Sequence, residues 1–270
     1  MKRYLNCGKR VSRLTSKPKI LIYDIETSQL ECSTWGIRDQ FISHEQIKKD
    51  WHLVAWAAKW VGTNEMLYAD QRKQRNKSDD KKLVLGLWKL LDKADIVITK
   101  NGKQFDQPRV YARCAVHGIN PPAPYEHIDV QQIAKRKFAF TSNSLAYLAK
   151  ALGVEPKDEH KKFPGRELWD ECEKGNLAAW REMEKYNKQD VRTTEAVYLK
   201  LRAWDAPVNI SGVGPGCPAC GVGRLERHGL RVTVAGVRQR YRCVGCGHWC
   251  QGAANLLPKE QRAEIKRRIA

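Results

Sequence analysis

The chain has 270 residues, of which 42% are hydrophobic and 29% charged, and its 49 Lys and Arg against 30 Asp and Glu give a net charge of +19. This composition can bury a core, which excludes wholesale disorder, and the length allows one medium-sized domain plus a small one. No apolar run approaches the roughly 18 residues of a membrane helix, and the N-terminus lacks the apolar stretch of a secretion signal. We therefore expect a soluble, cytoplasmic protein with no membrane association.

Hydrophobic periodicity predicts strands and helices that alternate along the central part of the chain. The expected strands cover residues 19–24, 51–61, 66–69, 95–99 and 127–130. The expected helices cover residues 79–94, 105–116, 143–152 and two stretches within 176–204, the second beginning near 190. This order predicts an α/β domain built on a central mixed sheet.

Charge and cysteine content divide the chain further. Residues 1–18 carry six basic residues and no acid, and residues 207–270 carry 11 basic residues against 3 acidic ones. Strongly basic ends favour a polyanion such as nucleic acid as partner, although solubilising tails are an alternative. We expect five parts: a basic arm (1–18), an α/β domain (19–206), a Gly/Pro linker (207–215), a cysteine module (216–252) and a basic C-terminal helix (253–270).

Acidic residues lie at or near the ends of three expected elements. Asp24 and Glu26 are two apart on a strand and therefore face the same way. Asp106 lies at the mouth of a helix, and Tyr186 and Asp190 are four apart on another helix, where they share a face. Taken alone, each has an ordinary structural explanation: a solvated strand end, a helix cap or an exposed helix pair. Their combination points to carboxylates that hold cations.

Together, Asp24-x-Glu26, Asn101-x3-Phe105-Asp106 and Tyr186-x3-Asp190 resemble the three ordered motifs of the DEDD superfamily of 3′–5′ exonucleases, also called DnaQ-like. The tyrosine form of the third motif is the one seen in proofreading domains of family B DNA polymerases. The histidine subgroup would have His where this chain has Lys185. The resemblance covers about residues 19–206 and implies an RNase H-like fold and a free-standing 3′–5′ exonuclease, a monomer acting on single-stranded DNA or DNA 3′ ends.

The resemblance also implies two catalytic Mg²⁺ or Mn²⁺ ions, whose preference for hard oxygen donors explains the carboxylates. We assign Asp24 as the bridging ligand, Glu26 and Asp190 as ligands of the water-activating ion, and Asp106 as an outer ligand of the other ion. Tyr186 would orient the attacking water, because its ordinary pKa near 10 makes it a poor base. Asn101, Phe105 and, more weakly, Thr27 are expected to contact the terminal nucleotide.

Two C-x-x-C-G knuckles lie near the C-terminus. Their four thiolates, from Cys217, Cys220, Cys243 and Cys246, predict one tetrahedral structural Zn²⁺ site in a reducing compartment. The segment between them is expected to form a hairpin, and the module to depend on zinc for folding. It resembles zinc ribbons of insertion-sequence transposases, which implies DNA binding through arginines, chiefly Arg231, Arg240 and Arg242, with Tyr241 and Trp249 as stacking surfaces; a protein-docking ribbon is the alternative.

Three other functions stay open at this point. A nuclease of the same fold that is structure-specific or acts on RNA fits the same acids. A non-catalytic protein that binds nucleic acid through its ribbon fits the charge distribution. A transposase-like strand-transfer enzyme is suggested only by the ribbon, and transposases lack the Tyr-x3-Asp motif.

Overall fold

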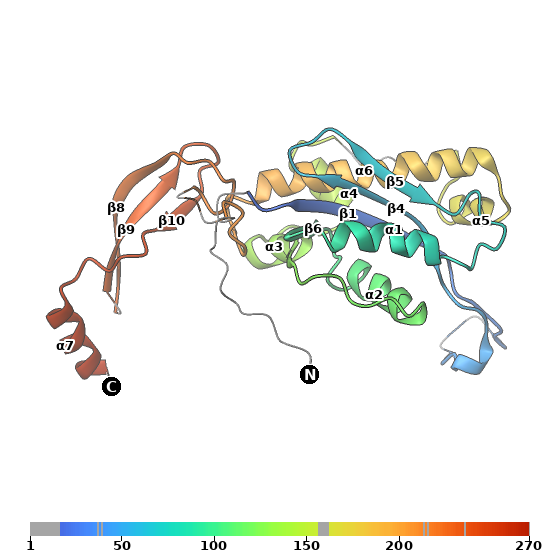
Figure 1. Cartoon of the computed structure of the whole chain (residues 1–270), viewed down its shortest axis with the longest axis horizontal. Helices are drawn as coiled ribbons and strands as arrows, with labels where there is room; N and C mark the ends of the chain where they lie inside the picture. Colours follow the sequence, from blue (N-terminus) through green and yellow to red (C-terminus); the bar gives the residue numbers. More distant parts are fainter. Residues whose placement is uncertain are drawn as a thin grey trace, which may run out of the picture. The chain divides into compact units, whose positions relative to one another are not determined.

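The computed structural model describes residues 17–36, 38, 40–155, 162–212, 214, 216–234 and 236–269. The chain forms two compact units, one spanning residues 19–201 and the other containing residues 202–270 (Figure 1). The predicted basic arm, residues 1–18, lies outside the described residues except for Lys17 and Pro18. Within the described residues, no helix is long and apolar enough to cross a membrane.

The larger unit is built on a five-stranded mixed sheet with strand order β5-β4-β1-β6-β7. β1 pairs parallel with β6 and antiparallel with β4, so it lies at the centre of the sheet. The sheet strands are β1 (Ile20–Thr27), β4 (Leu53–Trp60), β5 (Met66–Asp70), β6 (Ile96–Thr99) and β7 (Glu126–Asp129). The predicted strands and the mixed sheet are confirmed.

Helices cover both faces of this sheet. Residues 21, 23 and 25 of β1 pack with α1 (Lys81–Leu91) and α2 (Asp106–Val116) in one core cluster. Side chains alternate along a strand, so the even-numbered residues of β1 face the other side, where α6 (Leu177–Leu201) contacts β1 and β4. The shorter helices are α3 (Val130–Lys137), α4 (Leu145–Ala151) and α5 (Glu167–Glu173), and all three contact α6.

The expectation of two helical stretches within residues 176–204 is wrong, because α6 is one continuous helix of 25 residues. No Gly or Pro interrupts its sequence, so nothing breaks the hydrogen-bond ladder. The polar segment near its middle contains Tyr186 and Asn187, which are buried against the sheet. The sequence did not predict the helices α3 and α5. It also did not predict the small two-stranded sheet formed by β2 (Glu31–Cys32) and β3 (Ile47–Lys49), or the 3-10 turn (His44–Gln46) that precedes β3.

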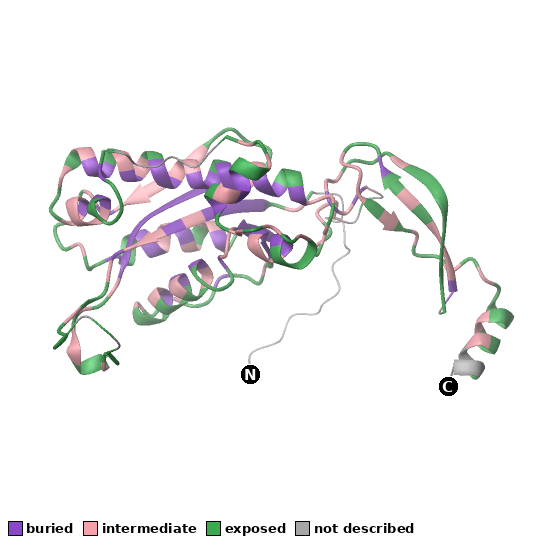
Figure 2. Cartoon of the chain, turned by 180° about the vertical axis from the view of Figure 1, so that it is seen from behind, coloured by how far each residue is buried: buried purple, intermediate pink, exposed green. Residues whose placement is uncertain are grey.

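The smaller unit contains the predicted hairpin as a three-stranded sheet, in which β9 lies between β8 and β10. Its elements are β8 (Leu225–Thr233), β9 (Gly236–Cys243), β10 (Trp249–Gln251) and α7 (Lys259–Ile269). Among the described residues of this unit, the buried hydrophobic cluster consists of Cys217, Ala219 and Cys243. Figure 2 shows the contrast: buried residues run through the sheet and helices of the larger unit and are sparse in the smaller one.

Candidate active site and metal centres

Three carboxylates meet where β1 faces α6. Asp24 and Glu26 occupy even positions of β1, on the face that α6 covers, and Asp190 lies among the buried residues of α6. One carboxylate oxygen from each of these three residues lies within 4.8 Å of the other two. The tertiary fold therefore brings together two of the three motifs that the sequence analysis singled out.

Asn187 holds the first of these carboxylates in place. Its Nδ2 donates a hydrogen bond to Asp24 Oδ2 over 2.7 Å, and its side chain is fully buried. This hydrogen bond orients the carboxylate of Asp24 towards α6. The sequence analysis missed Asn187. Its position three residues before Asp190, on the same helix face, is the signal that would have found it.

Tyr186 reaches the same space from α6. Burial raises the pKa of Tyr186 far above its ordinary value, and the carboxylates of Asp190 and Glu26 raise it further. The phenol therefore keeps its proton at neutral pH and can orient a water molecule but cannot act as a base. The ring of Trp169 packs edge-on against it, with centroids 6.0 Å apart and planes at 78°, and restricts its orientation.

Asp106 does not belong to the group of three carboxylates that lie within 4.8 Å of one another. Its Oδ1 accepts a hydrogen bond from the backbone N–H of Ile25 over 3.1 Å, which ties the start of α2 to β1. Burial raises the pKa of Asp106 to about 7, and nearby Asp129 adds to the shift. Its separation from the other acids suits the outer role expected for it.

All five predicted catalytic residues line one cavity of about 330 Å³. The cavity also includes Lys100 and the predicted substrate-binding residues Asn101 and Phe105. Thr27 lies instead in an adjoining cleft of about 620 Å³, which shares Glu26 and Phe105 with the cavity. Four acids around one small cavity repel each other, so the arrangement calls for cations.

The loop that carries Asn101 is held by one buried carboxylate. Asp129, at the end of β7, accepts hydrogen bonds from the backbone N–H groups of Asn101 and Lys103 over 3.0 and 3.2 Å while also capping α3. Asn101 has a left-handed backbone with φ of 65°, a conformation that Asn tolerates better than most residues. Its side-chain oxygen accepts from Gln131 Nε2 over 2.8 Å, which fixes the side chain at the cavity wall.

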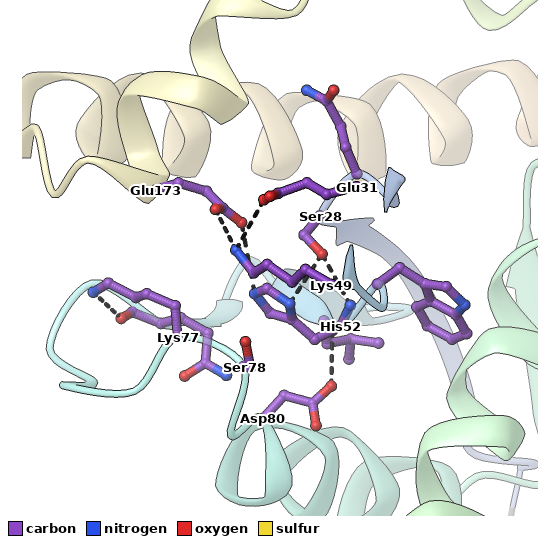
Figure 3. Close-up of polar contacts among 12 residues, drawn as sticks. Ser28, Glu31, Lys49, His52, Lys77, Ser78, Asp80 and Glu173 are labelled. Atoms are coloured by element: carbon purple, nitrogen blue, oxygen red, sulfur yellow. Dashed lines mark hydrogen bonds and ion pairs between the residues drawn. The ribbon is translucent and has the colours of Figure 1, made fainter. Parts of the chain in front are cut away.

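A buried polar network fixes the end of β1 beside the cavity (Figure 3). Ser28 Oγ lies 3.0 Å from His52 Nδ1 and accepts the backbone N–H of the same residue over 2.9 Å. His52 Nε2 lies 3.9 Å from Glu173 of α5, and Glu173 also pairs with Lys49 over 2.5 Å. Burial lowers the pKa of His52, so the imidazole is neutral and the network is structural. It holds the backbone next to Glu26 and Thr27 in one position.

Comparison with known proteins assigns the family. A family model described as the RNase H superfamily matches residues 49–202, which is more than half of the chain. The chain belongs to the RNase H superfamily. The matched range includes the second and third motifs but begins after Asp24 and Glu26. No curated protein matches the sequence.

Among solved structures, this RNase H superfamily protein is similar to a family B DNA polymerase from the hyperthermophilic archaeon Pyrobaculum calidifontis. The TM-score is 0.52 and the sequence identity 16%, and the match covers 77% of this chain and 27% of the polymerase. This chain therefore corresponds to about a quarter of the polymerase chain. At this identity the likeness concerns the fold.

Outside the RNase H domain, the four predicted zinc ligands come together. Their sulfur atoms all lie within 4.8 Å of one another, with 3.7 Å between Cys217 and Cys246 and 3.5 Å between Cys220 and Cys243. A tetrahedron with Zn–S bonds of about 2.3 Å has edges of roughly 3.8 Å, so the four thiols fit a zinc ion closely. Both knuckles turn through a glycine with left-handed φ, Gly221 and Gly247.

The predicted nucleic-acid residues of the smaller unit lie on one face of its sheet. Arg240 and Arg242 are two apart on β9, and their guanidinium carbons lie 5.0 and 5.9 Å from the ring centroid of Trp249. Arg231 pairs with Arg238, which has the same strand parity. The register places Tyr241 on the face opposite to Trp249, so the two predicted stacking surfaces lie on different faces of this sheet.

Proposed function

We propose that this chain is a metal-dependent 3′–5′ exonuclease of the tyrosine branch of the DEDD superfamily, acting on single-stranded DNA. Membership of the RNase H superfamily and structural likeness to a family B DNA polymerase support a nuclease. The observation that carries the proposal is the single cavity in which Asp24, Glu26, Asp106 and Asp190 meet Tyr186.

In this proposal Asp24, Glu26 and Asp190 hold two Mg²⁺ or Mn²⁺ ions, for which their oxygens are suitable donors, and Asp106 takes the outer role. When bound, such ions activate water and neutralise charge on the phosphate and the leaving oxygen. Asn187 orients Asp24, and Tyr186 donates or accepts hydrogen bonds to align the attacking water. Asn101 and Phe105 form the wall against which the terminal nucleotide rests.

The test uses 5′-labelled single-stranded DNA and RNA oligonucleotides with Mg²⁺ or Mn²⁺. We expect a ladder of products that shortens one nucleotide at a time, and loss of that ladder in D24N and D190N. The control E65Q removes an exposed acid outside the cavity and should cleave normally. A single internal cut would favour a structure-specific nuclease, preference for the RNA strand would favour an RNA-directed enzyme, and absence of cleavage under all conditions would leave a binding protein.

The zinc ribbon, in the same proposal, increases affinity for the nucleic acid. The support is its face of arginines around Trp249, which offers phosphates charge and bases a stacking surface. A protein-docking ribbon would not need this charge. The double substitution R240Q/R242Q should therefore reduce the slope of log affinity against log salt by about 1 to 2 without ending cleavage. An unchanged slope would favour protein docking.

A further inference from the structure

The cleft beside the acidic cavity is lined by a basic side chain, Arg109, that the proposed chemistry does not use. The cleft measures about 620 Å³ and joins the cavity at Glu26 and Phe105. Its other walls include Thr27, Trp51 and Arg109. It is therefore continuous with the place where the strand would react, and it is large enough for part of a nucleotide strand.

Arg109 is held in this cleft by two aromatic rings. Its guanidinium carbon lies 4.7 Å from the ring centroid of Trp51 and 4.3 Å from that of Phe105, and its Nη1 lies 3.4 Å from Thr27 Oγ1. Cation–π contacts fix a guanidinium but do not neutralise it. The residue comes from α2, one turn after Asp106, so the helix that places the outer acid also places this cation.

No carboxylate in the described parts of the chain forms an ion pair with Arg109. Partial burial lowers the pKa of Arg109, and the nearby carboxylate of Asp106 acts in the opposite direction. A partly buried guanidinium that forms no ion pair within the described residues keeps its donors available, and a bidentate phosphate contact would offset its desolvation. The ligand chemistry that the position favours is therefore an anionic phosphate.

The side chains that line the acidic cavity and those that line the adjoining cleft differ in the sign of their net charge. The acidic cavity has four carboxylates and one lysine, whereas the adjoining cleft has Glu26 against Arg109 and Arg166. A phosphate in the cavity needs cations to enter, but a phosphate in the cleft meets a positive group supplied by the chain. The same strand can thus place one phosphate in each space.

We infer that the cleft binds the reacting end of the nucleic acid strand and that Arg109 binds one of its phosphates other than the scissile one. This inference rests on the proposed function and extends it to a second subsite. The phosphate is either the next internucleotide linkage or a phosphate at the 3′ terminus. The rings of Trp51 and Phe105 pack against the sugar or base that accompanies it.

Binding of 5′-fluorescein single-stranded DNA to the full chain, followed by anisotropy in Ca²⁺, tests the inference. One oligonucleotide carries a neutral methylphosphonate at the second linkage from the 3′ end, and another carries a 3′-phosphate. For the wild type we expect the methylphosphonate to weaken binding, or the 3′-phosphate to strengthen it, by about tenfold or more. In R109Q the same modification should change binding less than twofold. The modification that responds identifies the phosphate.

Three controls keep the result interpretable. A methylphosphonate at the sixth linkage should have little effect, and R181Q, which removes an exposed charge from α6, should behave as the wild type. R109M replaces R109Q if the latter melts at a lower temperature. The inference is overturned if neither modification changes wild-type binding more than the sixth-linkage control, or if Arg109 variants respond as the wild type does. Absence of Mg²⁺-dependent cleavage would overturn the proposed function instead, because the binding comparison does not depend on hydrolysis.

Discussion

Asp106 is a single buried carboxyl whose ionisation lowers the stability of the fold. It is only 3% exposed, and burial raises its pKa to about 7 from an ordinary 3.8. The folded chain therefore binds more protons than the unfolded chain between these two values. Ionisation of Asp106 then destabilises the fold progressively as the pH rises from about 4 to about 7. A bound cation would remove this penalty.

The substitution D106N should accordingly stabilise the metal-free protein at pH 8. Asn keeps an oxygen to accept the Ile25 N–H but carries no charge, so we expect a gain on the order of 2 kcal/mol at pH 8 and almost none at pH 4. Thermal melts in EDTA at both pH values measure this difference. A gain that is equal at the two pH values would show that charge is not the cause. With Mg²⁺ added at pH 8, the wild type should gain more stability than D106N.

At this scale the sequence identifies residues whose type and spacing are distinctive. The acids and Tyr186 belong to ordered motifs, and the fold places all five on one cavity. Asn187 and Arg109 were not predicted, because the only signal for Asn187 is that it shares a helix face with Asp190, and a single Arg on a helix has no local signature. Their roles depend on a carboxylate of β1 and on the ring of Trp51, which only the tertiary fold brings near.

Among the elements, β4, α1 and α2 are joined by one buried carboxylate. Asp80, at the start of α1, accepts the Leu53 N–H over 2.8 Å and two hydrogen bonds from Arg113 of α2 over 2.8 and 2.7 Å. Burial by itself would raise the pKa of Asp80, but the hydrogen bonds from Arg113 and His117 lower it below its usual value. This carboxylate therefore stabilises the fold above the unfolded pKa near 4, and that stability is lost as the pH falls through the folded value.

The substitution D80A should lower the free energy of unfolding by about 3–5 kcal/mol at pH 7, because it leaves the guanidinium of Arg113, whose side chain is only 11% exposed, without its carboxylate partner. Urea unfolding at pH 7 measures the loss. The effect should shrink towards pH 3, where the wild type also loses the pair. The exposed control E65Q should unfold as the wild type does. A loss below 1 kcal/mol would mean that the three elements are held together chiefly by apolar packing.

The loop between β6 and α2 depends on a glycine. A Cβ on Gly102 would lie 2.2 Å from Thr99 Oγ1, so G102A must displace the loop that carries Asn101. We expect a cost of about 1–3 kcal/mol in stability and a larger relative loss of cleavage, because cavity geometry changes with the loop. The control G223A adds a methyl that meets no atom within 4 Å. Cleavage at the wild-type rate would show that the loop is not part of the site.

Elements with strong periodicity were predictable and those without it were not. The strands of the main sheet and α1, α2 and α4 have clear apolar patterns, and their existence and type are confirmed. The helix α3 begins directly at the end of β7, where Asp129 is both strand end and N-cap, so no loop signal separates the two elements. The two-residue strand β2 is too short to show alternation.

At the scale of the whole molecule, the two units differ in what stabilises them. The RNase H domain has apolar clusters on both faces of its sheet, whereas the smaller unit buries little beyond its cysteines. The strand β8 has no buried residue along its nine positions. Such a module lacks the apolar burial to offset its conformational entropy, so we expect the metal ion of the four-cysteine cluster, zinc in our proposal, to supply much of its folding free energy.

Removal of zinc should therefore unfold the smaller unit and leave the RNase H domain folded. We expect calorimetry of the intact protein to show a separate unfolding transition of the smaller unit at low temperature, and C220S or a strong chelator to abolish it. The same treatments should lower bound zinc from one ion per chain to none. Mg²⁺-dependent cleavage of short oligonucleotides should persist, because the acidic cavity lies wholly within residues 19–201. The matched control is C250S, since Cys250 lies on β10 outside the four-cysteine cluster and should keep the metal. Retention of the low-temperature transition after complete loss of zinc would contradict a metal-dependent fold, and loss of cleavage in C220S would show that the two units depend on each other.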